Sequence, residues 1–205
     1  MSTSNFDPKD LTKEKRLWDI FIASKRISFS RFNAITTTIV FILLLVNSWL
    51  TNQPVEETIE LVRDLSSVGL AISLSTLGFL LAGFTIFATV SQPSLSLKMA
   101  EITHPVSGLS YLKHNYFIFL RVFIYYLLFS IFCLLIIMFG HKGGLVPVLA
   151  SHFPYHEQVK FAVVKASYVL LFTGYYFLIM QLKSFIFNIY HSVMTSLRWK
   201  AEGYE

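Results

Sequence analysis

The sequence predicts an all-α polytopic membrane protein with four transmembrane helices and an N-terminal amphipathic helix. Two observations on composition point to this class: of the 205 residues 54% are hydrophobic and only 14% are charged, and the mean hydropathy is +0.58. Soluble domains carry about 25% charged residues, so this chain has too little charge for a solvated globular surface. The third observation is that four long segments lack Asp, Glu, Lys and Arg, as bilayer-spanning helices do.

Residues 1–32 form the first predicted region, a cytoplasmic, basic and amphipathic N-terminal segment. Within it, residues 10–32 place apolar side chains at mostly helical spacing opposite Lys and Arg. Such a segment can lie in the membrane interface with its basic side toward anionic headgroups. It also fits a surface that docks a protein, and the sequence leaves both interpretations open. The residues we expect to contact lipid headgroups are Arg16, Lys25, Arg26 and Arg31, together with Arg121 and Lys183 near the ends of two spans.

Residues 33–190 form the predicted transmembrane domain, and residues 191–205 form a cytoplasmic tail. The four spans cover about residues 34–51, 66–91, 116–140 and 162–187. A charge at the bilayer centre costs about 2.5–3.5 kcal/mol, so the positions of the charges limit where each span can lie. After Lys183 the next charge is Arg198, and we expect the fourth helix to continue beyond the membrane in between.

The distribution of basic residues predicts the orientation. Thirteen of the 17 Lys and Arg residues fall in residues 1–31, 91–121 and 183–205, which are alternate connections of the chain. The positive-inside rule therefore places both termini in the cytoplasm, and we expect an inner-membrane location. The net charge of +5 serves this topology, so we expect no direct nucleic-acid binding.

The second span carries a small-residue stripe, a set of small side chains that recur every three or four residues. Its members are Ser67, Ala71, Ser75, Gly78, Ala82, Thr85 and Thr89. Small residues let helix backbones approach closely in lipid, where no hydrophobic force drives helices together. The stripe therefore predicts a packing seam, and its hydroxyls leave a pore lining in an oligomer as the alternative.

The fourth span has a seven-residue period of small and amide side chains, which we call the polar seam. It consists of Ser167, Gly174, Gln181 and Asn188, and the period extends to Lys160 and Thr195. A strict seven-residue repeat favours a left-handed helix–helix contact. Because four spans carry two such seams, we expect one seam to close the protomer and the other to build a homo-oligomer.

No catalytic, cofactor-binding or metal-binding residues are predicted. His152 and His156 are close in sequence, but Pro154 lies between them and a convincing third ligand is missing. The single cysteine, Cys133, excludes an intrachain disulfide. No carboxylate lies within any predicted span, which argues against a proton-coupled transporter. We therefore expect a protein that is not an enzyme and needs no cofactor.

Small size, four closely connected spans, a basic N-terminus and the run GFLLAGFTIFATVSQPSL together resemble the four-span membrane subunits of anti-phage defence operons, as in the Kiwa system. The resemblance covers the architecture of residues 34–190. It implies homo-oligomeric assembly in the bacterial inner membrane and recruitment of a soluble, DNA-binding effector subunit on the cytoplasmic side. The expected function is thus a membrane sensor and scaffold that contacts lipids, sister copies and a soluble partner. The alternative is a pore-forming effector that depolarises the membrane.

Overall fold

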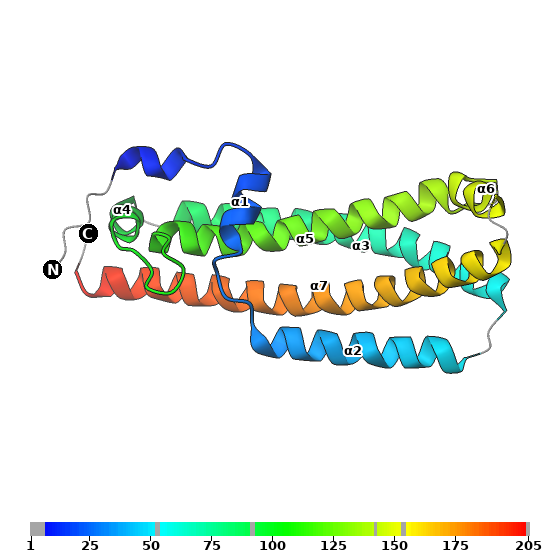
Figure 1. Ribbon diagram of the computed structural model, residues 1–205. Coiled ribbons are helices and arrows are strands. Elements are labelled where there is room, and N and C mark those ends of the chain that lie inside the picture. Colours follow the sequence, from blue (N-terminus) through cyan, green and yellow to red (C-terminus); the bar gives the residue numbers. More distant parts are fainter. Residues whose placement is uncertain (1–6, 52–53, 91–92, 142, 153–154, 204–205) are drawn as a thin grey trace. The chain divides into compact units, whose positions relative to one another are not determined.

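The computed structural model describes residues 7–51, 54–90, 93–141, 143–152 and 155–203, and these residues form an all-α chain (Figure 1). Its elements in chain order are η1 (Pro8–Thr12), α1 (Leu17–Ser24), α2 (Arg31–Leu50), α3 (Val55–Val90), α4 (Pro93–Glu101), α5 (Tyr111–Phe139), α6 (Leu145–Ser151) and α7 (His156–Ala201). The predicted all-α class is confirmed. The sequence analysis did not predict the short helices α4 and α6.

Four helices among the described residues are long and apolar enough to cross a membrane, namely Arg31–Leu50, Val55–Thr89, Tyr111–Phe139 and His156–Ala201. The protein is therefore a membrane protein of the polytopic class. Helix α3 begins well before the predicted span 66–91, and α7 extends beyond both ends of the predicted span 162–187, because hydropathy marks the segment in lipid whereas backbone hydrogen bonding continues into charged ends. The predicted continuation of the fourth helix is confirmed, since α7 ends at Ala201.

The N-terminal segment is not the single helix that the spacing of residues 10–32 suggests. It contains η1 and the eight-residue α1, and the residues between α1 and α2 are not helical. Local caps explain the interruptions. The carboxylate of Asp19 accepts hydrogen bonds from the backbone N–H groups of Lys15 and Arg16, and the Ser30 hydroxyl accepts one from Asn33 N–H at the start of α2.

The chain folds into two compact units. The central unit comprises Ser30–Leu77 and Tyr126–Met180, and the terminal unit comprises Met1–Phe29, Gly78–Tyr125 and Gln181–Glu205. Helices α3, α5 and α7 each contribute to both. This division does not follow the predicted regions 1–32, 33–190 and 191–205, because those regions were drawn from hydropathy and the units reflect packing. Residues 1–6, 52–53, 91–92, 142, 153–154 and 204–205 of the predicted regions lie outside the described residues.

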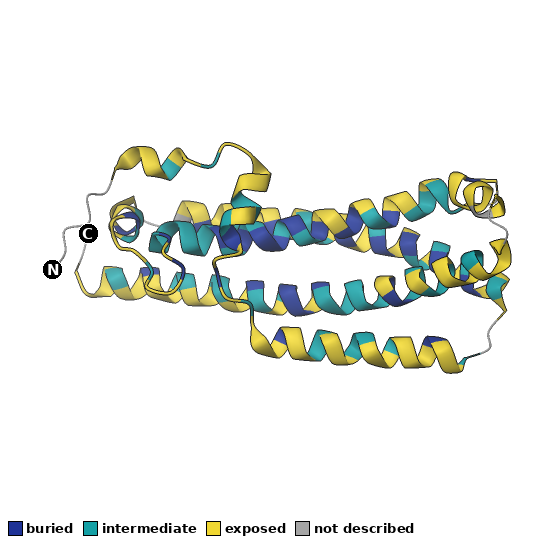
Figure 2. Ribbon diagram, viewed as in Figure 1, coloured by how far each residue is buried: buried dark blue, intermediate teal, exposed yellow. Residues whose placement is uncertain are grey.

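In the central unit, α2 runs beside α7 (Figure 1). Its two buried residues are Asn33 and Ser48, which lie near opposite ends of the helix. Asn33 Nδ2 donates to the Met180 carbonyl at 3.0 Å, and Lys165 Nζ donates to the Ser48 carbonyl. The long outer side of α2 is exposed, as Figure 2 shows, and its side chains are those expected to face lipid.

Two tyrosines connect further helices of the central unit. Tyr126 Oη on α5 donates to the Leu178 carbonyl on α7 at 3.1 Å, and Tyr175 Oη on α7 donates to the Leu65 carbonyl on α3 at 2.5 Å. A helix carbonyl has a second lone pair after its own helical bond, so it can accept such a donor without breaking the helix. Hydrogen bonds to the main chain therefore join α2, α3, α5 and α7 within this unit.

In the terminal unit the helices are held mainly by aromatic side chains. Phe84 and Phe87 of α3 meet Phe119 of α5 with ring centroids 6.4 and 5.0 Å apart, and Phe119 meets Phe185 of α7 at 5.3 Å. Phe119 is 1% exposed. The rings adopt tilted and edge-to-face geometries, which aromatic quadrupoles favour over face-to-face stacking.

Candidate functional site

Helix α3 presents two different faces. Its inner face carries Val62, Ser66, Ser73, Leu80 and Phe87, all of which are buried. These residues recur at helical spacing and form the contact side of α3 in each unit. The face that packs within the protomer therefore lies next to, and not on, the predicted small-residue stripe.

All seven residues of the small-residue stripe are exposed in the protomer. Around Gly78, a Cβ atom would meet nothing within 4 Å. The hydroxyls of Thr85 and Thr89 donate to the carbonyls of Leu81 and Thr85 on their own helix, at 2.9 and 3.0 Å. These hydroxyls thus need neither water nor another protein group as an acceptor, so the stripe is compatible with a closely packed, dry neighbour.

Two glycines of the central unit, among the described residues, pack tightly against side chains of another helix, and the sequence analysis singled out only one of them. At Gly69 of α3, a Cβ would lie 2.5 Å from Tyr175 Oη and 3.0 Å from Cys133 Sγ. At Gly174 of α7, a Cβ would overlap the ring of Phe129 on α5. Gly69 lies outside the regular spacing of the stripe, and nothing in the local sequence separates it from the exposed Gly78.

The polar seam of α7 lies toward the interior. Ser167, Gly174 and Asn188 are half-buried, while Gln181 is 4% exposed and its Nε2 has no hydrogen-bond partner among the described residues. The two extensions of the period are solvent-accessible: Lys160 forms an ion pair with Glu56 at 3.0 Å, and Thr195 Oγ1 donates to the His191 carbonyl. Within the central unit, the contact between Gly174 and Phe129 makes this part of the seam a contact between helices of one protomer.

Arg121 holds the N-terminal segment against α5. Its side chain is buried, with the residue 9% exposed, and Nη1 donates to the carbonyls of Ser24 and Ile27 at 3.2 and 3.0 Å. The guanidinium also lies 5.7 Å from the ring centre of Phe29. Carbonyls at the end of a helix lack intrahelical donors and carry negative partial charge, and α1 ends at Ser24. This placement differs from the headgroup contact expected for Arg121.

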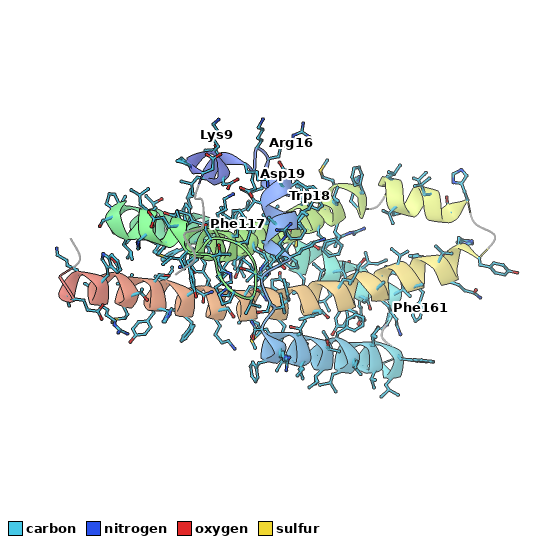
Figure 3. The ribbon with its side chains drawn as sticks, turned by 60° about the vertical axis from the view of Figure 1, so that its left-hand side comes forward. Lys9, Arg16, Trp18, Asp19, Phe117 and Phe161 are labelled. Carbon is cyan, nitrogen blue, oxygen red and sulfur yellow. The ribbon has the colours of Figure 1, made fainter. Side chains whose placement is uncertain are left out.

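The five other basic residues expected at headgroups, Arg16, Lys25, Arg26, Arg31 and Lys183, are all exposed. Figure 3 shows Arg16 pointing away from α5. Near it, Leu17, Trp18 and Ile22 leave 48%, 56% and 52% of their surface exposed. Segment 17–26 therefore presents apolar and basic side chains together.

The opposite side of the N-terminal segment is packed. Ile27 lies in a buried cluster with Leu109 and Phe117, and Ile20 and Ala23 pack against that cluster. An ion pair between Lys113 and Glu14, 2.5 Å long and largely shielded from solvent, joins the beginning of the segment to α5. The segment is consequently fixed on the protein, with its exposed side available to a membrane surface or to a partner.

A histidine pair that the sequence analysis missed is formed by His104, in the connection between α4 and α5, and His114, near the beginning of α5. The rings of His104 and His114 are stacked with centroids 3.9 Å apart, and His114 Nδ1 lies 3.0 Å from Ser107 Oγ. Burial, followed by the nearby His104 and Arg121, lowers the pKa of His114 from 6.5 to about 4. Gly108, with a φ of +67°, turns the chain back so that the two histidines meet. Pro105 and Gly108 between the histidines are the sequence signal that predicts such a turn.

The other histidines do not form a metal site in the described part of the chain, where no group of three His, Cys, Asp or Glu side chains could hold an ion. His152 Nδ1 lies 2.8 Å from the Val148 carbonyl, and His156 Nε2 lies 3.4 Å from Glu157 Oε1. Pro154 lies outside the described residues.

Comparison with known proteins finds no match among protein-family profiles, curated proteins or solved structures.

Proposed function

We propose that the protein is a non-enzymatic inner-membrane sensor and scaffold that self-associates through α3 and recruits a soluble partner on the cytoplasmic side. The observation that carries the proposal is the exposed small-residue stripe of α3, which no other part of the protomer covers among the described residues. Small stripes are a recurrent means of helix association in lipid, because they allow backbones to approach and gain van der Waals contact. A second copy of the chain supplies the same stripe and hence a self-complementary surface.

The N-terminal segment supports the recruitment part of the proposal. Arg121 and the ion pair between Lys113 and Glu14 fix it on α5, which reduces the conformational entropy that binding would cost. Its exposed side combines Trp18 with Arg16, and aromatic and Arg side chains are enriched at protein interfaces. The basic charge favours a partner with an acidic surface. The resemblance to Kiwa-type membrane subunits suggests that this partner is the effector of an anti-phage defence system.

Self-association is tested by in-cell crosslinking and by particle mass in nanodiscs. Gly78→Leu is expected to remove crosslinked dimers and higher species while leaving the helix content unchanged, because a Leu side chain at Gly78 meets open space within the protomer. Phe79→Leu is the matched control, since Phe79 is 83% exposed and lies off the stripe. A wild-type protein that is monomeric in both measurements overturns self-association.

Recruitment is tested by isolating the protein from its native membrane in mild detergent and identifying soluble proteins encoded beside it. A double change of Arg16 and Trp18 to Ala is expected to lose the partner. The control changes the exposed Arg198 and Tyr190 to Ala at the other end of the chain. Recovery of the protein alone under several gentle detergents contradicts recruitment.

The alternative function is a pore lined by the same stripe, because Ser75 and Thr85 expose hydroxyl-bearing side chains on it. Gln181 is buried, so it is not available as a lining residue. A pore predicts ion leak from liposomes that contain the protein alone, and Ser75→Leu and Thr85→Leu should abolish the leak while assembly persists. A scaffold predicts no conductance.

A further inference from the structure

The central unit contains a cavity of about 660 Å³ that the functional proposal does not use. Its lining residues come from α3, α5, α6 and α7, at the end of the unit where α6 lies (Figure 1). Ligand pockets occupy about 300–1,000 Å³, and the volume of this cavity falls within that range.

The walls of the cavity are apolar. They are formed by Ile59 of α3, Phe132 and Ile136 of α5, Val146 of α6 and Val164 of α7. Such walls favour hydrocarbon over a polar solute, because a buried polar group without a hydrogen-bond partner costs free energy. Three of the helices that form them, α3, α5 and α7, are also long enough to cross the membrane, so acyl chains are the nearest source of hydrocarbon.

One rim of the cavity carries charged side chains, among them Arg63 and Lys160. Arg63 Nε and Nη2 donate to the Gly140 carbonyl at 2.9 and 2.6 Å, and none of the ion pairs between described residues gives Arg63 a carboxylate. Lys160 also lines the cavity and is paired with Glu56 outside it. Glu157, on the same rim, lies 3.4 Å from His156. Among the described residues, Arg63 therefore lines this rim without an ion pair to a carboxylate, and Glu157 is the acidic side chain that lines the same rim.

The same rim includes the first turn of α7, from His156 to Lys160. The N-terminus of a helix carries partial positive charge and attracts anions. Together with Arg63 it makes the rim complementary to a phosphate, while the walls beneath suit a hydrocarbon chain.

We propose that this cavity binds an anionic phospholipid, with one acyl chain between α3, α5, α6 and α7 and the phosphate at Arg63. The site goes beyond the proposed function, since neither self-association nor partner recruitment is needed for it. Charge-assisted hydrogen bonds to a phosphate are stronger than neutral ones, which explains why the site selects an anionic lipid.

The experiment uses the full-length protein in nanodiscs that contain a phospholipid with a photoreactive acyl chain. One set carries a phosphatidylglycerol probe and the other a phosphatidylcholine probe, each at the same low mole fraction. Labelled peptides are mapped by mass spectrometry. The expected result is labelling of residues 132–151 that favours the phosphatidylglycerol probe and is not reduced by added inorganic phosphate.

Variants then separate the contribution of the acyl chain to lipid binding from the contribution of the headgroup. Val164→Trp fills the cavity and should remove labelling with both probes, whereas Val68→Trp, on the exposed surface of α3, should leave it unchanged. Arg63→Gln should reduce phosphatidylglycerol labelling about tenfold. Because Arg63 also bonds Gly140, Lys160→Gln provides a second rim variant, and Asp64→Asn is the control.

Helix content and monodisperse elution confirm that each variant is folded. Equal labelling by the two probes in the wild-type protein overturns the headgroup selectivity. Undiminished labelling of folded Val164→Trp overturns the acyl-chain site. Loss of labelling on addition of inorganic phosphate overturns it as well, because it identifies a site for free phosphate.

Discussion

The two units of the molecule hold their helices together by different means. In the central unit, Asn33, Tyr126, Lys165 and Tyr175 each donate to a backbone carbonyl of another helix, and Arg63 donates to the carbonyl that follows α5. In the terminal unit, aromatic rings from α3, α5 and α7 fill the space between helices. Arg121 is the one buried cation among the described residues of that unit, and it donates to carbonyls of the N-terminal segment.

The difference shows two ways to specify helix contacts where lipid is the solvent. Hydrogen bonds between helices contribute only about 0.6 kcal/mol each in membranes, but their geometry selects one register. Removal of a large buried ring leaves a cavity and costs several kcal/mol. We therefore expect the stability of the terminal unit to fall when a buried side chain is made smaller. The stability of the central unit should fall when a side chain is enlarged at a close helix contact and, by a smaller amount, when a single hydrogen bond is removed.

Phe119→Ala should have the largest effect. Phe119 is almost completely buried and contacts Phe84, Phe87 and Phe185, so its removal is expected to lower the free energy of unfolding by about 3–5 kcal/mol. Equilibrium unfolding in mixed detergent micelles measures this change. The exposed Phe79→Ala should change stability by less than about 0.5 kcal/mol. Equal effects of the two changes would contradict the aromatic core.

Gly174→Leu should have the next largest effect. It is expected to lower the free energy of unfolding by about 1–3 kcal/mol, because the new side chain would overlap the ring of Phe129 in the central unit. The matched control is Gly78→Leu, which has open space around it within the protomer and should unfold like the wild type when both are measured at a detergent excess that keeps them monomeric. The same unfolding measurement compares the two variants. If Gly174→Leu is tolerated, α5 and α7 are not in the close contact described.

Tyr126→Phe removes one hydrogen bond to the Leu178 carbonyl and preserves the ring. The expected loss is about 0.6 kcal/mol, the average for such bonds in membranes. Tyr155→Phe, at an exposed position, should have no measurable effect. A loss above about 3 kcal/mol for Tyr126→Phe would mean that single hydrogen bonds dominate the central unit.

The smallest expected effect is a pH response of the histidine pair in the terminal unit. Because the pKa of His114 is lowered from 6.5 to about 4, the unfolded loop binds more protons than the folded loop between these values. Local stability should therefore be full above pH 6.5 and decrease as the pH falls toward 4. Hydrogen exchange of residues 102–114 at pH 7 and pH 5 measures it. His114→Gln should remove the pH dependence, and His152→Gln should not.

The helical class and the four spans could be predicted because hydropathy is a local property of the chain. Which face of α3 packs inside the protomer could not be predicted, because Gly69 and Gly78 are both small residues in the same apolar segment. Only the position of Tyr175 and Cys133 makes Gly69 a close contact. The role of Arg121 was equally inaccessible, because its acceptors depend on where α1 ends. The cavity at Arg63 required the placement of α6, a helix too short for hydropathy to reveal.

The bond between Arg121 and Ile27 has a consequence for biosynthesis. Ile27 precedes Arg121 by 94 residues, so the ribosome delivers the carbonyl acceptors of the N-terminal segment well before the guanidinium that needs them. The carbonyls of Ser24 and Ile27 are therefore already synthesised when the Arg121 side chain leaves the ribosome. The order of synthesis itself reduces the time during which this charge is without a protein partner.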